Sequence, residues 1–295
     1  MRKQIFCLLA IFCAWPVYAA SAETGQLTVP ANAIVPGAIN GAGVELQVHP
    51  LGLSLPVLSP DVAARLNLSH SIFKVQARIG TSKLPGRTGV VRLSVNGAEQ
   101  KRRVLWFARA QRAGADAVLG PGAVPQNVVA FRFGTPDANT RIFQFPLVRQ
   151  NNRMGTLVRV GQAAIFVQWD FGRARSLATA AAAAAIASAH SGVLVGKPHE
   201  ETIEFGVERP VQLVRLDAGL TIGPLKISEV DARIRDYGTT AGIQTDDADP
   251  SEIIVTAKGR RDRSIYHLIV GARDMKACSR LEFDKAAAII RLYCS

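Results

Sequence analysis

The chain has 295 residues, is 48% hydrophobic and carries a formal net charge of +12 at pH 7. A chain of this length can bury a sizeable core and ordinarily divides into two domains. The positive charge favours association with anionic polymers or lipid headgroups. Aromatic residues do not alternate with the basic ones, so we do not expect a nucleic-acid-binding protein.

The first 22 residues have the pattern of a secretory signal peptide. Met1–Lys3 is basic, Ile5–Ala19 is apolar and Ala20–Ala22 offers an A-x-A cleavage site. About 15 apolar residues fall short of the roughly 20 that span a bilayer, which disfavours a membrane anchor. A lipoprotein signal is disfavoured because Phe12 precedes Cys13 where a small residue is needed. We therefore expect a periplasmic or secreted protein without a membrane span.

Removal of this signal would leave Cys278 and Cys294 as the cysteines of the mature chain. Two cysteines in an exported protein indicate one disulfide bond. Two buried free thiols are the alternative.

A β-rich stretch in the middle of the chain ends on an acidic residue. Ile165–Asp170 is largely apolar, Gly172 permits a sharp turn, and Leu177–Ala189 favours a helix. The small residues Ala178–Ala189 are too few and too weakly apolar to span a membrane. The pattern predicts a single carboxylate at the tip of a loop.

This loop, Asp170-Phe171-Gly172, resembles the active-site loop of pepsin-like and retropepsin-like aspartic proteases, in which Asp-Thr/Ser-Gly follows a strand and precedes a short helix. Such proteases use two carboxylates that share a proton and activate one water. The resemblance implies that Asp170 is the remaining acid of such a pair. Phe171 stands where the family has a hydroxyl residue that braces the loop.

A similar stretch lies 120 residues earlier. Val44–Val48 leads into the loop His49–Ser54, and Val57–Leu66 resembles the helical segment that follows the loop in bacterial periplasmic members of the family. Setting Gly52 against Gly172 aligns the two stretches.

The alignment places Pro50 against Asp170, which predicts that the first half has lost its carboxylate. His49 lies beside this loop, where a solvent-facing or hydrogen-bonded role is favoured over a catalytic one. The histidines show no metal-ligand spacing, and the sequence has neither a Walker-type phosphate loop nor a long glycine-rich dinucleotide turn, so we expect neither a metal nor a cofactor. The remaining histidines are His70, His190, His199 and His267.

Further elements recur in the same order. Val90–Val95 and Arg103–Phe107 flank Asn96-Gly97, a hairpin signal, and Leu220–Val230 repeats the strand-turn-strand pattern. Matched elements in one order indicate an internal duplication.

A third pair of matching segments lies near the end of the two halves, one segment in each half. Asp116–Gly120 and His267–Gly271 resemble the hydrophobic-hydrophobic-Gly motif that lies behind the catalytic loop in this family. The resemblance predicts a mainly β, two-lobed acid protease fold with short helices, its lobes at residues 23–150 and 151–295. It also implies an ending in which a short helix precedes a hairpin that brings Cys278 and Cys294 together.

The predicted duplication has a geometric consequence. Gly52 and Gly172 should face each other across a cleft, with the Cα atoms of Pro50 and Asp170 within about 10 Å. Apolar residues of the loop strands should pack beneath the cleft instead of lining it. These residues are Leu46, Val48, Phe166 and Val167.

The charged segment Thr239–Arg263 lengthens the second half. Charge runs of this kind are usually solvated loops. Inside it, Glu252–Ala257 is similar to the TonB box, which pairs as an added strand with a periplasmic partner. An ordinary loop or edge strand is favoured over docking of such a partner.

Three functions remain open. The first is an inactive member of the fold that binds a peptide or protein ligand in the inter-lobe cleft, because Pro50 replaces one acid. The second is an active aspartic endopeptidase that uses Asp170 with an unidentified partner. The third is an envelope binding module for peptide or glycan.

Overall fold

The computed structural model describes residues 25–246 and 264–295. The expected signal peptide and the TonB-box-like segment Glu252–Ala257 lie outside the described residues. Strands predominate, as the sequence predicts. Among the helices of the described residues, none is long and apolar enough to cross a membrane.

The first sheet has seven strands in the order β2-β3-β8-β4-β7-β6-β5. Asn96 and Gly97 have φ of 50° and 77°, the left-handed conformation that a two-residue hairpin turn requires. This turn starts the second arm of the hairpin at Ala98 and not at Arg103. The strands are β2 (Ile34–Ile39), β3 (Ala42–Val48), β4 (Val57–Leu58), β5 (Val75–Ile79), β6 (Ser82–Val95), β7 (Ala98–Phe107) and β8 (Ala117–Leu119).

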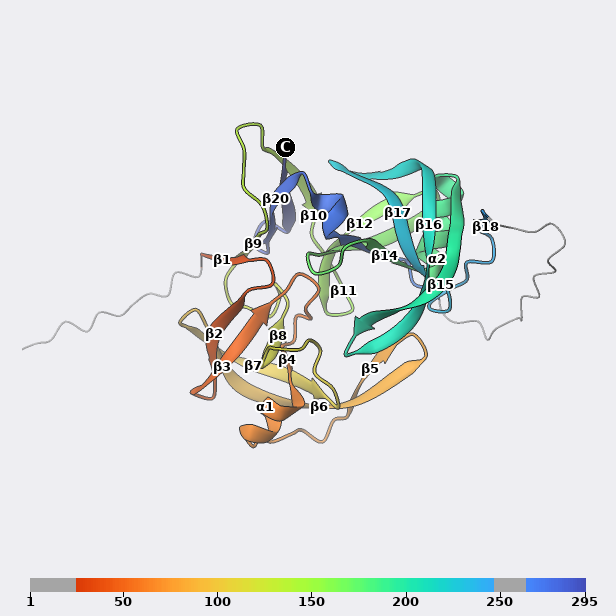
Figure 1. Cartoon of the computed structure of the whole chain (residues 1–295). Helices are drawn as coiled ribbons and strands as arrows, with labels where there is room; N and C mark the ends of the chain where they lie inside the picture. The colour runs from red at the N-terminus through yellow and green to blue at the C-terminus, as the bar shows by residue number, and fades with distance from the viewer. Residues whose placement is uncertain (1–24, 247–263) are drawn as a thin grey trace, which may run out of the picture.

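The second sheet has nine strands in the order β11-β12-β13-β19-β14-β17-β16-β15-β18. Figure 1 shows the first sheet below and the second sheet at the upper right. The strands are β11 (Val148–Gln150), β12 (Arg153–Val160), β13 (Ala163–Asp170), β14 (Ser176–Thr179), β15 (Gly192–Glu204), β16 (Val207–Ile222), β17 (Leu225–Arg233), β18 (Gln244–Thr245) and β19 (His267–Gly271).

The two sheets share one pairing pattern. In the first, β3 pairs in parallel with β8, and β4 lies between β8 and β7. In the second, β13 pairs in parallel with β19, and β14 lies between β19 and β17. The strands of both hydrophobic-hydrophobic-Gly motifs therefore lie beside the strands that carry the two loops.

A helix follows β4 in the first sheet and β14 in the second. Helix α1 (Pro60–Arg65) is capped by the Ser59 hydroxyl, which accepts a hydrogen bond from the Val62 N–H. Helix α2 (Ala180–Ala189) begins later than the predicted start at Leu177. The preceding residues form β14 because pairing on both sides satisfies their backbone groups, which outweighs helix propensity.

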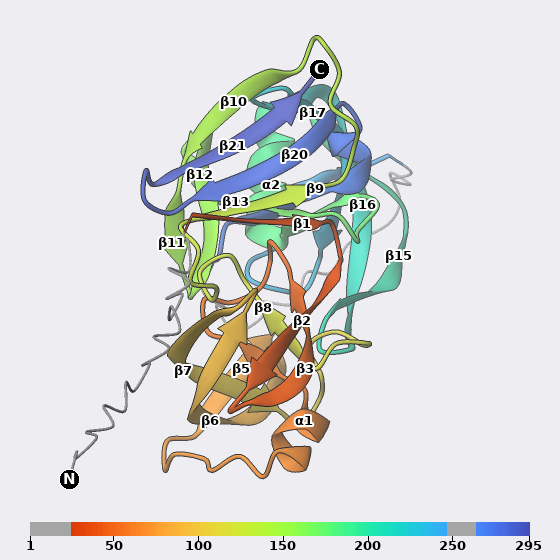
Figure 2. The same cartoon turned by 90° about the vertical axis from the view of Figure 1, so that its left-hand side faces the viewer.

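A five-stranded sheet connects the two halves in the order β1-β9-β20-β21-β10. It draws strands from both predicted lobes and lies above the first sheet in Figure 2. The lobe boundary between residues 150 and 151 stays a prediction. The strands are β1 (Gln26–Pro30), β9 (Val128–Arg132), β10 (Arg141–Pro146), β20 (Cys278–Asp284) and β21 (Ile289–Cys294).

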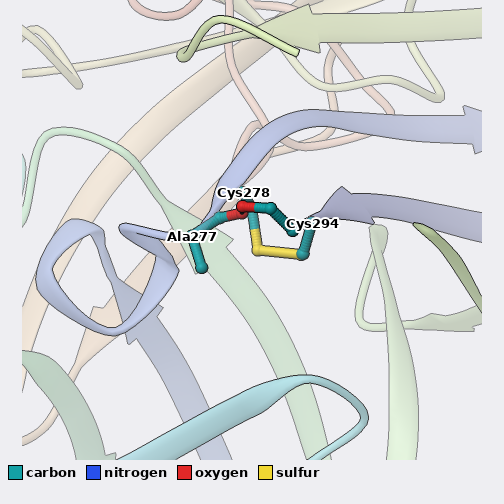
Figure 3. Close-up of a disulfide and its surroundings, with 4 residues drawn as sticks. Ala277, Cys278 and Cys294 are labelled. Atoms are coloured by element: carbon teal, nitrogen blue, oxygen red, sulfur yellow. A yellow bond between two sulfur atoms is a disulfide. The ribbon is translucent and has the colours of Figure 1, made fainter. Parts of the chain in front are cut away.

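The chain ends in the predicted short helix and hairpin. The 3-10 helix η1 (Ala272–Met275) precedes β20, and Cys278 lies opposite Cys294 in the β20–β21 register. Their sulfur atoms are 2.01 Å apart and both residues are buried (Figure 3). The predicted disulfide bond is confirmed.

Loss of this disulfide should lower the free energy of unfolding by about 3 kcal/mol, because a cross-link across a short loop restricts the unfolded chain. Urea unfolding of the Cys278→Ser/Cys294→Ser double variant measures the loss. Reductant should destabilise the wild type and leave the double variant unchanged. Equal stability of the wild type and the variant would contradict the expected contribution.

Candidate functional site

The two predicted loops meet at a pair of buried side chains. His49 Nε2 lies 3.4 Å from Asp170 Oδ1, and the two residues are 0% and 4% exposed. His49 follows β3 directly and Asp170 is the last residue of β13. The residue that faces Asp170 is therefore His49.

The strand register explains this placement. Asp170 lies opposite Gly271, the glycine of the second hydrophobic-hydrophobic-Gly motif. In the first sheet the residue before His49 lies opposite Leu119, and the His49 N–H donates to the Leu119 carbonyl at 2.8 Å. His49 thus stands beside Gly120 as Asp170 stands beside Gly271.

Alignment by the loop glycines predicts Pro50 opposite Asp170, and this prediction is wrong because His49 occupies that position. Two residues separate His49 from Gly52, whereas one residue separates Asp170 from Gly172, so matching Gly52 to Gly172 displaces the alignment by one residue. The first sheet carries a histidine where the second carries the acid.

The two loop glycines have different surroundings. A Cβ on Gly52 would lie 2.4 Å from the backbone nitrogen of Gly120, so Gly52 allows its loop to pack on the neighbouring strand. The Gly172 N–H instead donates to Asp170 Oδ1 at 2.8 Å. The contact between the loops is made by His49 and Asp170.

Both carboxylate oxygens of Asp170 have partners. Oδ1 accepts from Gly172, and Oδ2 accepts from the guanidinium of Arg112 at 3.3 Å. Burial by itself would raise the pKa of Asp170, but His49, Arg112 and the Gly172 N–H outweigh it and hold that pKa well below its usual range. Asp170 is an ionised and hydrogen-bonded carboxylate.

Sequence reasoning missed Arg112, which lies in the loop between β7 and β8 and is about one-third exposed. It reaches Asp170 from the opposite half of the chain. The chain has many arginines in loops, and no spacing or motif distinguishes this one.

His49 is held as a neutral imidazole. The Leu51 N–H donates to Nδ1 at 3.1 Å, so Nδ1 carries no hydrogen and Nε2 carries the one that faces Asp170. Burial lowers the pKa of His49, outweighing the Asp170 carboxylate that would raise it. The predicted hydrogen-bonded role is observed, but on a fully buried side chain.

Phe171, the middle residue of the second loop, packs against aromatic residues. Its ring stacks on Phe133 at a centroid distance of 4.4 Å and contacts Phe131 at 5.9 Å. Phe131 belongs to β9, so apolar contacts with the five-stranded sheet anchor this loop.

A cleft of about 710 Å³ lies between the two larger sheets. Leu46, Val48 and Val167 are buried, as expected, but Phe166 contributes to the cleft wall. The wall also includes Leu51, Leu53, Val75, Ile79, Leu105, Phe107, Arg153, Arg173, Ile203, Phe205, Arg233 and His267.

Two hairpins close this cleft from opposite halves. At the tip of β5–β6, the Gly80 N–H donates to the Tyr237 hydroxyl at 3.0 Å. At the tip of β15–β16, the Phe205 N–H donates to the Gln111 carbonyl at 3.4 Å, and the Phe205 ring meets Phe107 edge-on at 5.0 Å. Each hairpin contacts the other half of the chain (Figure 1).

Two arginines of the cleft wall form ion pairs with glutamates. Arg153 binds Glu204 at 2.7 Å, and Arg173 binds Glu201 at 2.5 Å. Burial, with the charges of Arg153 and Arg233, lowers the pKa of His267 to about 3. In the described ranges, no group of three or more His, Cys, Asp or Glu could hold a metal ion.

No protein-family model and no curated protein matches this chain. Two solved structures are similar to part of it. The retroviral protease-like domain of Ddi1 from Leishmania major is 13% identical, over 31% of this chain and 74% of that one, with a TM-score of 0.24. EIAV protease complexed with the inhibitor HBY-793 is 20% identical, over 30% and 81%, with a TM-score of 0.23.

Proposed function

We propose that this chain is an exported protein of the aspartic-protease fold, built from two copies of one unit, that lacks peptidase activity and binds an extended peptide in its cleft. The shared strand pairing of the two sheets supports the duplication. The pattern of the first 22 residues supports export.

The pairing of Asp170 with His49 carries the proposed inactivity. Peptide hydrolysis by this fold needs two carboxyl groups that share one proton, so that one acts as acid and the other as base. A neutral imidazole whose Nδ1 is occupied by the Leu51 N–H cannot supply a second carboxyl. Arg112 further stabilises the ionised form of Asp170, which therefore holds no proton to donate.

The edge strand β5 supports peptide binding. β5 pairs with β6 and ends the sheet order, so its second side is a free edge in the described sheet. All five of its residues, Val75–Ile79, contribute to the cleft wall. An extended peptide can add to such an edge through backbone hydrogen bonds, with its side chains in apolar pockets.

Binding can be tested by fluorescence anisotropy with labelled peptides from reduced casein as the probe. Ile203→Arg places a charge in the cleft wall and should weaken binding at least about tenfold, since an unpaired charge in an apolar site opposes association. Leu157→Arg is the matched control, because Leu157 is 48% exposed and is not part of the cleft wall.

The control should bind as the wild type does. Absence of saturable binding by the wild type, or equal weakening by the two variants, would contradict peptide binding in the cleft.

A further inference from the structure

We propose a second binding site, for a phosphate-type oxyanion, formed by Arg102, Arg149 and Lys285 where the three sheets meet. Arg102 lies on β7, Arg149 on β11, and Lys285 directly follows β20. Each of the three sheets therefore supplies one cation.

The three side chains surround a cavity of about 700 Å³. It adjoins the peptide cleft, with which it shares Leu55, Asn151 and Asn152, but its cations are not part of the cleft wall. The other residues of its wall are Ser54, Gly122, Asn127, Met154 and Ala286.

No acidic residue balances these charges. The cavity wall contains neither Asp nor Glu, and none of the three cations forms an ion pair within the described residues. Asp284, the acid next to Lys285 in sequence, binds Arg291 at 3.0 Å. The cluster therefore has a positive charge that no carboxylate of the cavity wall compensates.

One hydrogen-bond donor of the cluster also lacks a partner. Lys285 Nζ donates to the Val124 carbonyl at 2.6 Å, and Arg102 donates to the Gly122 carbonyl at 3.3 Å. Nε of Arg102 is buried without a hydrogen-bond partner. Burial, with the charges of Arg102 and Arg149, lowers the pKa of Lys285 to about 8. An anion would relieve this repulsion and accept the free donor.

A phosphate-type oxyanion fits this arrangement best. Its tetrahedral oxygens can accept from several converging donors, and Arg and Lys are the side chains that commonly bind phosphate. Ser54, Asn127 and Asn151 add neutral donors to the wall. The cavity is larger than a single phosphate ion, so the anion can be diphosphate or part of a larger molecule.

Isothermal titration calorimetry with inorganic pyrophosphate at physiological salt tests the site in the full mature chain. Arg149→Gln and Lys285→Gln should each weaken binding about tenfold or more, the loss expected for one hydrogen bond to a charged group. Lys285→Arg should retain binding. Arg159→Gln is the control, because it removes the same charge from an exposed position of β12 outside the cavity.

Thermal unfolding without ligand should show all four variants folded, and Arg149 is exposed enough that its replacement leaves the core intact. Sedimentation with vesicles of phosphatidic acid then distinguishes a lipid headgroup from a free phosphate. Absence of saturable binding to both probes would overturn the site. Equal weakening by Arg159→Gln would also overturn it, because the attraction would then come from the overall charge.

Discussion

Phe205→Ala is expected to lower the free energy of unfolding by about 4 kcal/mol, the loss typical of a buried phenylalanine. Phe205 is 3% exposed at the tip of the β15–β16 hairpin. It packs with Phe107 of the first sheet in an apolar cluster whose members come from both sheets. Its removal therefore leaves a cavity and also detaches one of the two hairpins that close the cleft.

Urea unfolding measures the loss, and hydrogen exchange should become faster in β15 and β16 before it does so in the central strands. The control is Phe73→Ala, which should change stability by less than about 0.5 kcal/mol because Phe73 is 67% exposed. A loss below about 1 kcal/mol for Phe205→Ala would show that the hairpin tip contributes little to holding the halves together.

Acidification from pH 7 to pH 5 is expected to destabilise the protein by about 2 kcal/mol through His267, and His49 acts in the same direction. Burial lowers the pKa of His49, and it lowers the pKa of His267 to about 3. In the unfolded chain both histidines take up a proton near pH 6.5, whereas in the folded chain both are protonated only at lower pH. The unfolded state thus binds more protons below pH 6.5.

The stability that each histidine contributes is therefore present above pH 6.5 and is lost as the pH falls. For His267 the loss is about 1.4 kcal/mol per pH unit. The lowered pKa of Asp170 acts in the same direction, but in a more acidic range. Burial raises the pKa of Asp274, which opposes the effect. Single variants are needed to separate these contributions.

Urea unfolding at a series of pH values measures this slope. His49→Gln and His267→Gln should each reduce it between pH 7 and pH 5. The matched control, His199→Gln, removes a histidine from an exposed position of β15. An unchanged slope in His49→Gln would mean that His49 is protonated in the folded protein, contrary to the hydrogen bond from the Leu51 N–H.

Much of the architecture could be predicted because local signals agree with the fold. Asn96-Gly97 fixes a hairpin through its left-handed backbone, and the two hydrophobic-hydrophobic-Gly strands lie beside the loop strands. The start of α2 could not be predicted, because the pairing of β14 with two distant strands decides it. Helix propensity carries no information on such long-range pairing.

The candidate site was only half predictable. Asp170 ends an apolar strand and can be recognised from the sequence. Alignment by the loop glycines matches Asp170 to Pro50 and not to His49, because the two loops differ in length. The strand register gives the correct match to His49. Arg112 acts across the two halves, and its role follows only from the packing of the β7–β8 loop against Asp170.

We propose that the protein does not hydrolyse peptides, because Asp170 is paired with a neutral histidine and not with a second carboxyl group. A peptide-cleavage assay with the purified mature protein, from pH 3 to pH 8, tests it most directly. We predict no cleavage above background for the wild type and for Asp170→Asn. Cleavage by the wild type that is abolished by Asp170→Asn would contradict the account.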